Sequence, residues 1–206
     1  MSKECIVVLR ALQEIPQKDS CDYIGVDEGA FYLAQNHILM KLAVGDFDSI
    51  HQEDENIIKK YSESIIHLNP IKDDSDSEHT IKELISQGYD KIHVYGGLGN
   101  RIDHEVVNLR LAMQYPNQVF FYDSFHKIYA LDKGFYKIQE DFKYFSLFAK
   151  DKVELSIKGT KYELDHKVMS YDDLFGLSNE IEGIAELTIY QGILLVIHSN
   201  DSINKK

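Results

Sequence analysis

The sequence predicts an α/β fold with a mainly parallel sheet and flanking helices, followed by a C-terminal all-β sandwich. Up to about Asp123, short β-branched runs alternate with helix-like segments, which is typical of a parallel sheet covered by helices. After Asp123, short alternating or aromatic runs are separated by turn residues, and this pattern favours a sandwich. We therefore expect two domains, residues 1–124 and residues 125–206.

The strands and helices of the first domain are predicted from hydrophobic periodicity. The brief, β-branched runs expected to be strands are residues 5–9, 23–26, 42–44, 65–68, 92–95 and 119–122. The segments expected to be helices are residues 31–37, 53–61, 76–87 and the stretch that follows Asp103 and ends before Pro116. In the helix over 76–87, Ile81, Leu84 and Ile85 form one apolar face, and Gly88 is the expected stop.

The second domain is predicted to consist of short strands joined by tight turns. The expected strands are residues 127–131, 144–148, 152–157, 185–190 and 193–198. Turn residues punctuate them at 132–134, 158–159 and 191–192. Because Gly192 lies between two strong strand-like runs, we expect a hairpin turn there.

Composition restricts the class of protein. The chain has 206 residues, is 44% hydrophobic and carries a net charge of −12. Acidity of this size argues against nucleic acid and anionic membrane surfaces as partners, although a bound cation could still attract a nucleotide. Cys5 and Cys21 lack the spacing of metal ligands, and no apolar run approaches the roughly 18 residues of a membrane span. The N-terminal apolar run is too short for a signal peptide, so we expect a reducing, cytoplasmic location.

Acidic patterns follow several predicted strands. They are Gly-Val-Asp-Glu-Gly-Ala at 25–30, Gly-Asp-Phe-Asp-Ser at 45–49, Lys-Asp-Asp-Ser-Asp at 72–76, and Gly-Gly-Leu-Gly-Asn-Arg-Ile-Asp-His at 96–104. The carboxyl ends of strands in an α/β sheet converge on one crevice, where carboxylates would repel one another without a cation. Mg²⁺ takes one or two carboxylates and leaves room for phosphates, which Arg101 and Lys72 could also bind. The residues thus predict a magnesium-dependent phosphoryl-transfer site.

Each pattern also has an interpretation without catalysis. Ser75 with Glu78 forms a capping box, and Asp103 could be only a helix N-cap. The glycines at 96–99 fit neither a P-loop nor a Rossmann fingerprint. Two other functions stay open. Asp46 and Asp48 resemble the nucleophile motif of magnesium-dependent phosphatases, and the chain could be an acidic metal- or vitamin-binding module without turnover.

Taken in order, the four patterns resemble the thiamine pyrophosphokinase family. That family carries G-x-D-G-G-A, then G-D-F-D-S, then K-D-x-T-D, then G-x-x-G-G-R-x-D-H. The second half is also similar to the family, through residues 158–164 and the Gly-Leu-Ser-Asn-Glu turn at 176–180. The resemblance implies a homodimer with sites at the subunit interface. It also implies transfer of pyrophosphate from ATP to thiamine, with residues 1–124 binding ATP and residues 125–206 binding thiamine.

The resemblance also assigns expected roles to individual residues. The implied Mg²⁺ ligands are Asp46, Asp48 and Asp76. The implied catalytic residues are these three together with Asp73, Arg101 and Asp103. The implied ATP-binding residues are Asp27, Lys72, Ser75, Gly97, Arg101 and His104, and the implied thiamine-binding residues are Ser178 and Asn179.

Three positions depart from the family pattern. Glu28 and Asn100 stand where the family has glycine, and Ser75 stands where it has threonine. Ser75 keeps the hydroxyl group, whereas Glu28 adds bulk and charge near the expected nucleotide site. The chain has no Trp, so any stacking on the thiamine rings must use Tyr or Phe. The sequence does not decide whether Asp73 or Asp103 accepts the proton of the attacking alcohol.

Overall fold

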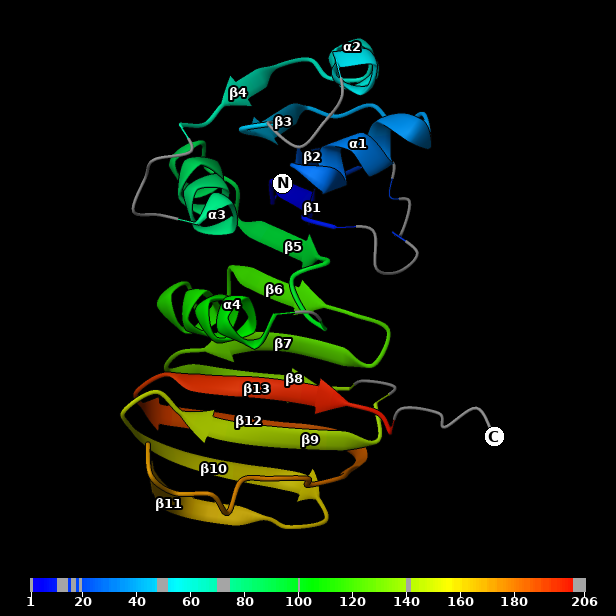
Figure 1. The fold of residues 1–206 in the computed structure, drawn as a ribbon. Helices are drawn as coiled ribbons and strands as arrows, with labels where there is room; N and C mark the ends of the chain where they lie inside the picture. The colour runs from blue at the N-terminus through cyan, green and yellow to red at the C-terminus, as the bar shows by residue number, and fades with distance from the viewer. Residues whose placement is uncertain are drawn as a thin grey trace. The chain divides into compact units, whose positions relative to one another are not determined.

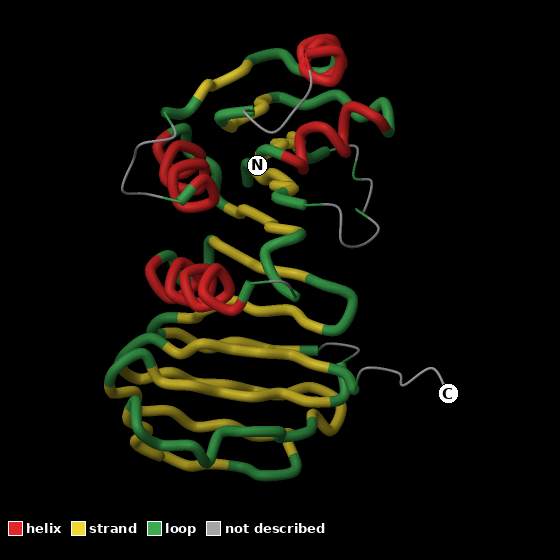
Figure 2. The backbone as a smooth tube through the Cα atoms, viewed as in Figure 1, coloured by secondary structure: helices red, strands yellow, loops and turns green. Residues whose placement is uncertain are grey.

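The computed structural model describes residues 2–10, 15, 18, 20–47, 52–69, 75–99, 101–139 and 142–201 (Figure 1). It divides into two compact units. The first comprises Met1–Asn108 and Phe121–Asp123, and the second comprises Leu109–Phe120 and Ser124–Lys206. Helices are concentrated in the first unit and strands in the second (Figure 2).

The first unit is built on parallel strands. These are β1 (Glu4–Val8), β2 (Asp22–Val26), β3 (Leu42–Gly45), β4 (Ile65–His67) and β5 (Lys91–Tyr95), arranged in the order β4-β3-β2-β1-β5. The helices are α1 (Glu28–Gln35), α2 (Gln52–Lys60), α3 (Asp76–Ser86) and α4 (Ile102–Gln114). Helices α1 and α3 lie on opposite faces of this sheet (Figure 1). Coverage on both faces explains why the strands are apolar without alternation.

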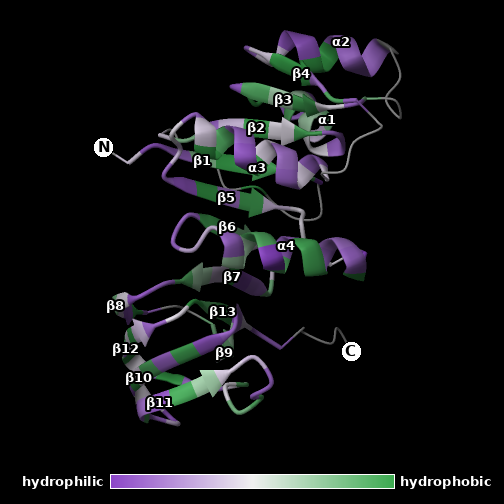
Figure 3. Ribbon diagram, turned by 90° about the vertical axis from the view of Figure 1, so that its left-hand side faces the viewer, coloured by the Kyte–Doolittle hydropathy of each residue, from purple (hydrophilic) through white to green (hydrophobic). Residues whose placement is uncertain are grey.

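The core on the α1 face shows how strand and helix residues meet. Ile6 and Val8 of β1 are fully buried in one cluster with Ala30 and Leu33 of α1. Ile58 of α2 joins the same cluster, while the rest of α2 is mainly hydrophilic (Figure 3). In the part of the chain that the structure describes, no helix combines the length and apolar character needed to cross a membrane.

The helix ends follow local sequence signals. Ser75 is the N-cap of α3, and its hydroxyl oxygen accepts a hydrogen bond from the Glu78 backbone N–H at 3.2 Å, as the capping box predicts. The α3 helix ends before Gly88, whose φ is 79°, so the expected glycine stop is confirmed. Helix α1 begins at Glu28, three residues before the expected start. The first turn of α1 packs closely on the end of β1, because a Cβ on Gly29 would lie 1.9 Å from the Val8 carbonyl oxygen.

The second unit is antiparallel. Its strands are β7 (His126–Leu131), β8 (Gly134–Ile138), β9 (Tyr144–Ala149), β10 (Lys152–Thr160), β11 (Leu164–Ser170), β12 (Ile181–Gln191) and β13 (Leu194–Ser199), and β6 (Val119–Tyr122) precedes them. Strand β13 pairs with β7 and β9, and a separate four-stranded sheet has the order β11-β10-β12-β8. Both sheets contribute to one core, in which Phe145 of β9 and Leu155 of β10 are fully buried.

Three expectations about the sheets need correction. The first is that the protein has a mainly parallel sheet. This holds only for β4-β3-β2-β1-β5, because β7, β13 and β9 make the sheet a mixed one. The second is the strand list, which lacks β8 and β11; β11 is a mostly exposed edge strand and therefore carries little apolar signal. The third is the hairpin at Gly192, which is wrong because β12 and β13 belong to different sheets.

Candidate active site

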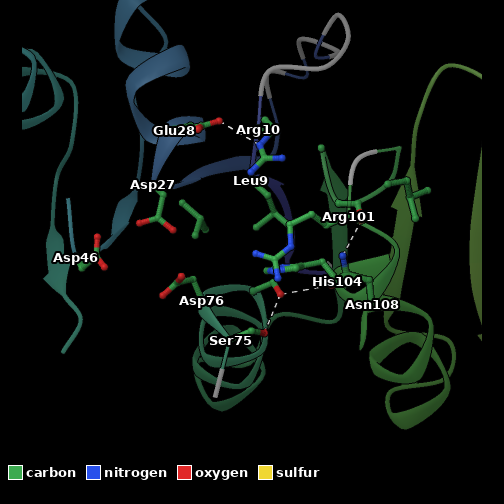
Figure 4. A pocket seen from close by; sticks show the side chains of 15 residues that line it. Leu9, Arg10, Asp27, Glu28, Asp46, Ser75, Asp76, Arg101, His104 and Asn108 are labelled. Carbon is green, nitrogen blue, oxygen red and sulfur yellow. Dashed lines mark hydrogen bonds and ion pairs between the residues drawn. The ribbon is translucent and has the colours of Figure 1, made fainter. Parts of the chain in front are cut away.

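A cavity of about 360 Å³ opens in the first unit at the carboxyl ends of its parallel strands (Figure 4). The residues that line it are Leu9, Arg10, Val26, Asp27, Glu28, Asp46, Ser75, Asp76, Ser77, Gly96, Gly97, Leu98, Arg101, His104 and Asn108. Most of them follow β1, β2, β3 or β5 or lie at the start of α1, α3 or α4, whereas Val26 is the last residue of β2 and Asn108 lies in the middle of α4. The strand-end patterns therefore do converge on one cavity, which is where α/β sheets bind ligands.

Acidic and basic groups occupy different sides of this cavity. Asp27, Asp46 and Asp76 lie toward one side, and Arg101 and His104 lie toward the other (Figure 4). The three aspartates come from the end of β2, the end of β3 and the first residue of α3. A cation on the acidic side and an anion next to the guanidinium would both be stabilised, as a metal–polyphosphate complex requires.

The fold fixes Asp27 tightly. Its φ is 48° and its ψ is −117°, a conformation that residues other than glycine rarely adopt, and its backbone N–H donates to the Val44 carbonyl at 2.9 Å. A Cβ on Gly45 would lie 2.2 Å from the Asp27 Oδ1 atom. A larger residue at position 45 would therefore displace the Asp27 carboxylate from the position it has here.

The donor set fits Mg²⁺. Carboxylate oxygens are the ligands this ion prefers, and it commonly takes only one or two from the protein. Within the described ranges, no three His, Cys, Asp or Glu side chains are grouped closely enough to hold a metal ion. Asp48, an expected ligand, lies outside the described residues, as do Lys72 and Asp73.

Arg101 is held by Asp103 rather than by the cavity wall. Its Nε donates to Asp103 Oδ1 at 3.2 Å and its Nη2 donates to Oδ2 at 2.5 Å. This pairing raises the pKa of Arg101 and lowers the pKa of Asp103, so both groups stay charged at neutral pH. Asp103 does not line the cavity, in contrast to Asp27, Asp46, Ser75, Asp76, Gly97, Arg101 and His104.

A buried polar network supports the floor of the cavity. The Asn108 side chain donates through Nδ2 to the Gly97 carbonyl at 2.7 Å and accepts through Oδ1 from the Ser77 hydroxyl at 3.3 Å. The Ser77 hydroxyl oxygen lies 3.1 Å from the Ser75 hydroxyl oxygen. The network joins α3, α4 and the glycine turn at 96–99. The sequence does not predict this role of Ser77, because the role depends on how α3 and α4 approach each other.

Arg10 and Glu28 line the cavity as an ion pair, with 3.1 Å between Nε and Oε2 (Figure 4). The sequence patterns do not predict this pair, because Glu28 is only a departure from the family pattern and Arg10 belongs to none of the motifs. The strand-end rule could have found Arg10, because it follows β1 as Asp27 follows β2.

The expected thiamine turn lies in the second unit. Ser178 has a φ of 56°, and its backbone N–H donates to the Ser146 hydroxyl at 2.9 Å. The Asn179 side chain is buried: its Nδ2 donates to Thr160 Oγ1 and to the Tyr162 carbonyl, and its Oδ1 accepts from the Tyr162 and Glu180 backbones. Asn179 thus holds the turn in place, while Ser178 is exposed.

Comparison with known proteins identifies similar sequences over most of the chain. The family model "Thiamin pyrophosphokinase, catalytic domain" matches residues 16–121, and "Thiamin pyrophosphokinase, vitamin B1 binding domain" matches residues 135–194. A thiamine pyrophosphokinase of Bacillus subtilis is 29% identical over 187 residues, which is 87% of each chain.

Solved structures are similar to the whole chain. The crystal structure of thiamine pyrophosphokinase from Bacillus subtilis has a TM-score of 0.85 and 25% identity, covering 97% of this chain and 100% of that one. The crystal structure of a thiamin pyrophosphokinase family protein from Enterococcus faecalis also has a TM-score of 0.85, with 27% identity over 98% of this chain and 100% of that one.

Proposed function

The chain belongs to the thiamine pyrophosphokinase family, and on that premise we propose that it transfers the pyrophosphoryl group of ATP to the hydroxyethyl oxygen of thiamine. The products are thiamine diphosphate and AMP, because the attack is on the β-phosphorus. The observation that carries the proposal is the cavity of the first unit, where Asp27, Asp46 and Asp76 oppose Arg101. Such a site accelerates the transfer by positioning the reactants and by neutralising the charge of the polyphosphate.

Magnesium is the proposed cofactor. Asp46 and Asp76, which line the cavity, and Asp48 from the same pattern as Asp46 are the proposed ligands. When bound, Mg²⁺ would neutralise charge on the polyphosphate and lower the barrier to phosphoryl transfer. Asp27, Lys72, Ser75, Gly97, Arg101 and His104 are the proposed nucleotide contacts.

Of the two candidates for the general base, Asp103 is among the described residues and Asp73 is not. Asp103 is paired with Arg101 and its pKa is lowered by that hydrogen bond, which makes it a weak proton acceptor. We assign Asp103 the role of orienting Arg101 and assign Asp73 the role of accepting the alcohol proton. Asp73→Asn should then lower kcat far more than Asp74→Asn, which changes the next residue in the sequence. Equal kcat in both variants would rule out Asp73 as the base.

We propose that residues 1–124 form a domain that binds ATP. We propose that residues 125–206 form a β-sandwich domain that binds thiamine. The shared core of the two sheets in the second unit supports the sandwich description. Ser178 is the proposed direct thiamine contact, and Asn179 positions it through its bonds to Thr160 and Tyr162. Free Cys5 and Cys21 favour a reducing, cytoplasmic compartment.

The proposed assembly is a homodimer. Large apolar side chains are exposed in the second unit, among them Tyr171, Leu174 and Leu177 at 73%, 74% and 62%. These three residues lie close together in the sequence, and exposed apolar side chains that gather on a surface are typical of a protein interface. Leu174→Asp should convert a dimer into a monomer in sedimentation velocity, whereas Leu39→Asp, at a similarly exposed site in the first unit (71%), should not. A monomeric wild type would overturn this assembly.

The activity itself is tested by turnover. Purified protein would be incubated with thiamine, ATP and Mg²⁺, and AMP and thiamine diphosphate would be quantified. Stoichiometric formation of both, abolished by EDTA and restored by Mg²⁺, is the expected result. ADP with thiamine monophosphate would move the attack to the γ-phosphorus. The absence of any thiamine-dependent product from folded protein would reject the proposed reaction.

A further inference from the structure

The Arg10–Glu28 ion pair adds a feature that the family pattern does not contain. Glu28 stands where that pattern has glycine, and Arg10 lies outside all the matched motifs. Their side chains both line the cavity, and Glu28 Oε2 accepts a hydrogen bond from Arg10 Nε at 3.1 Å. The pair is therefore a chain-specific element of the site.

The backbone holds both residues in place. Leu9, next to Arg10, donates its N–H to the Tyr95 carbonyl at 2.9 Å. A Cβ on Gly96 would lie 2.2 Å from the Arg10 carbonyl oxygen and 2.5 Å from its nitrogen, so the turn after β5 packs directly on Arg10. Glu28 is the first residue of α1, where a carboxylate is favoured by the helix dipole. The backbone is thus held at both positions, at Arg10 by the turn after β5 and at Glu28 by α1.

The hydrogen bond to Glu28 leaves both Nη groups of Arg10 available to bind a ligand. Glu28 accepts a hydrogen bond only from Nε, and no residue in the described part of the chain accepts one from either Nη group. Arg101 differs, because Asp103 occupies its Nε and Nη2. The Nη edge of a guanidinium matches two oxygens of a phosphate.

The Arg10–Glu28 ion pair contributes little to the stability of the fold. The side chains are 37% and 64% exposed, and ion pairs at such exposure contribute little to stability. Ligand binding is the property that the pair can change, since a partly exposed guanidinium beside a cavity remains within reach of an anion. The other groups that line the acidic side would repel an anion unless cations of the protein or solvent compensate.

We propose that Arg10 binds phosphate oxygens of the nucleotide through its Nη groups, and that Glu28 orients it by holding Nε. Arg10 is then a second guanidinium contact for the polyphosphate, and Glu28 is a positioning residue. The identity of the anion as a nucleoside triphosphate rests on the proposed function. The glycine that the family pattern has at position 28 could not hold Arg10 in this way.

The test measures ATP affinity directly, by titration calorimetry with Mg²⁺ and without thiamine. Arg10→Ala should weaken ATP binding at least tenfold, and Arg10→Lys should recover part of the loss because it keeps the charge. Glu28→Ala should weaken binding less, and should have no further effect when combined with Arg10→Ala. Lys41→Ala is the matched control, since the Lys41–Glu63 pair is similarly exposed (51% and 64%) and does not line the cavity.

A second readout separates ligand binding from a merely structural role. In the turnover assay, Arg10→Ala should raise the KM for ATP while leaving the KM for thiamine within twofold. ATP affinity of Arg10→Ala within twofold of the wild type, with the wild type active, would overturn the inference and leave the proposed function intact. Wild-type protein that binds no ATP would overturn both. Arginine-dependent ATP binding without thiamine turnover would support the inference and reject the reaction.

Discussion

At the scale of single residues, Asn108 shows how a buried amide in the cavity lining can hold the parts of the site together. Its two hydrogen bonds join the Gly97 carbonyl to the Ser77 hydroxyl, and the side chain is buried. Asn108→Ala should lower the free energy of unfolding by roughly 1–3 kcal/mol, because it leaves the half-buried Gly97 carbonyl without its hydrogen-bond donor. Urea denaturation would measure this. The control is Asn36→Ala, which removes a similar 2.8 Å bond from Asn36 to the Tyr32 carbonyl at an exposed site. Equal losses in the two variants would show that burial does not matter here.

Asp46 carries the proposed metal role, and its substitution should separate activity from folding. It lines the cavity directly after β3. Asp46→Asn keeps the size of the side chain but removes its charge. We expect turnover to fall by about 100-fold or more, because metal-assisted charge stabilisation is worth several kcal/mol. The melting temperature should change little. Asp151→Asn, at an exposed turn of the second unit, is the matched control and should keep full activity. Near-normal turnover of Asp46→Asn would remove Asp46 from the proposed ligand set.

At the scale of secondary-structure elements, the turn after β5 depends on two separate properties of glycine. Gly96 and Gly88 both have positive φ, 78° and 79°. A Cβ would have open space at Gly88, whereas at Gly96 it would lie 2.2 Å from the Arg10 carbonyl oxygen. Gly88→Ala should therefore lower stability by about 1 kcal/mol through backbone strain alone. Gly96→Ala should lower it further, because β1 and β5 must also move apart, and it should weaken ATP binding. Thermal unfolding of the two variants side by side would decide. The same small loss in both would mean that the close approach at Gly96 is relieved without cost.

The elements also show which parts of the structure could be predicted from the sequence. The parallel strands of the first unit were recognisable because both faces are buried and the apolar runs are continuous. Strand β11 was not, because an exposed edge strand has almost no apolar pattern. The turn at Gly192 has the local signature of a hairpin, but β12 and β13 pair with partners far away in the sequence. Pairing of that kind depends on the whole sheet rather than on the turn.

In the site too, the sequence predicts which strand ends meet but not which separate elements come into contact. Asp27, Asp46, Asp76 and Arg101 could be grouped from sequence because the carboxyl ends of parallel strands always meet. The Ser77–Asn108 contact and the packing of Gly96 on Arg10 come from the approach of separate elements, and no spacing rule encodes them. The roles of the grouped residues in catalysis stay predictions until the variants are measured.

At the scale of the whole molecule, the stability of the fold should depend on pH through the fully buried His198, and burial also lowers the pKa of His93. His198 of β13 is fully buried, with Phe145 beside it and the Tyr129 hydroxyl 3.1 Å from its Nε2. Burial lowers its pKa to about 4, with a smaller contribution from Lys127. The unfolded chain has a histidine pKa of about 6.5, so it takes up the proton first as the pH falls. The imidazole therefore leaves stability unaffected above pH 6.5 and reduces it progressively between pH 6.5 and 4.

This difference in pKa corresponds to a loss of roughly 3 kcal/mol once the pH is below both values. Urea denaturation followed by circular dichroism between pH 7.5 and 4.5 would measure it. His198→Gln, which keeps a hydrogen-bond partner for Tyr129, should be less stable at neutral pH but should lose less stability on acidification than the wild type. Carboxylates contribute to acid unfolding in both proteins, so only the difference between the two pH profiles is attributable to His198. Parallel profiles for wild type and His198→Gln would mean that the buried imidazole does not control acid stability.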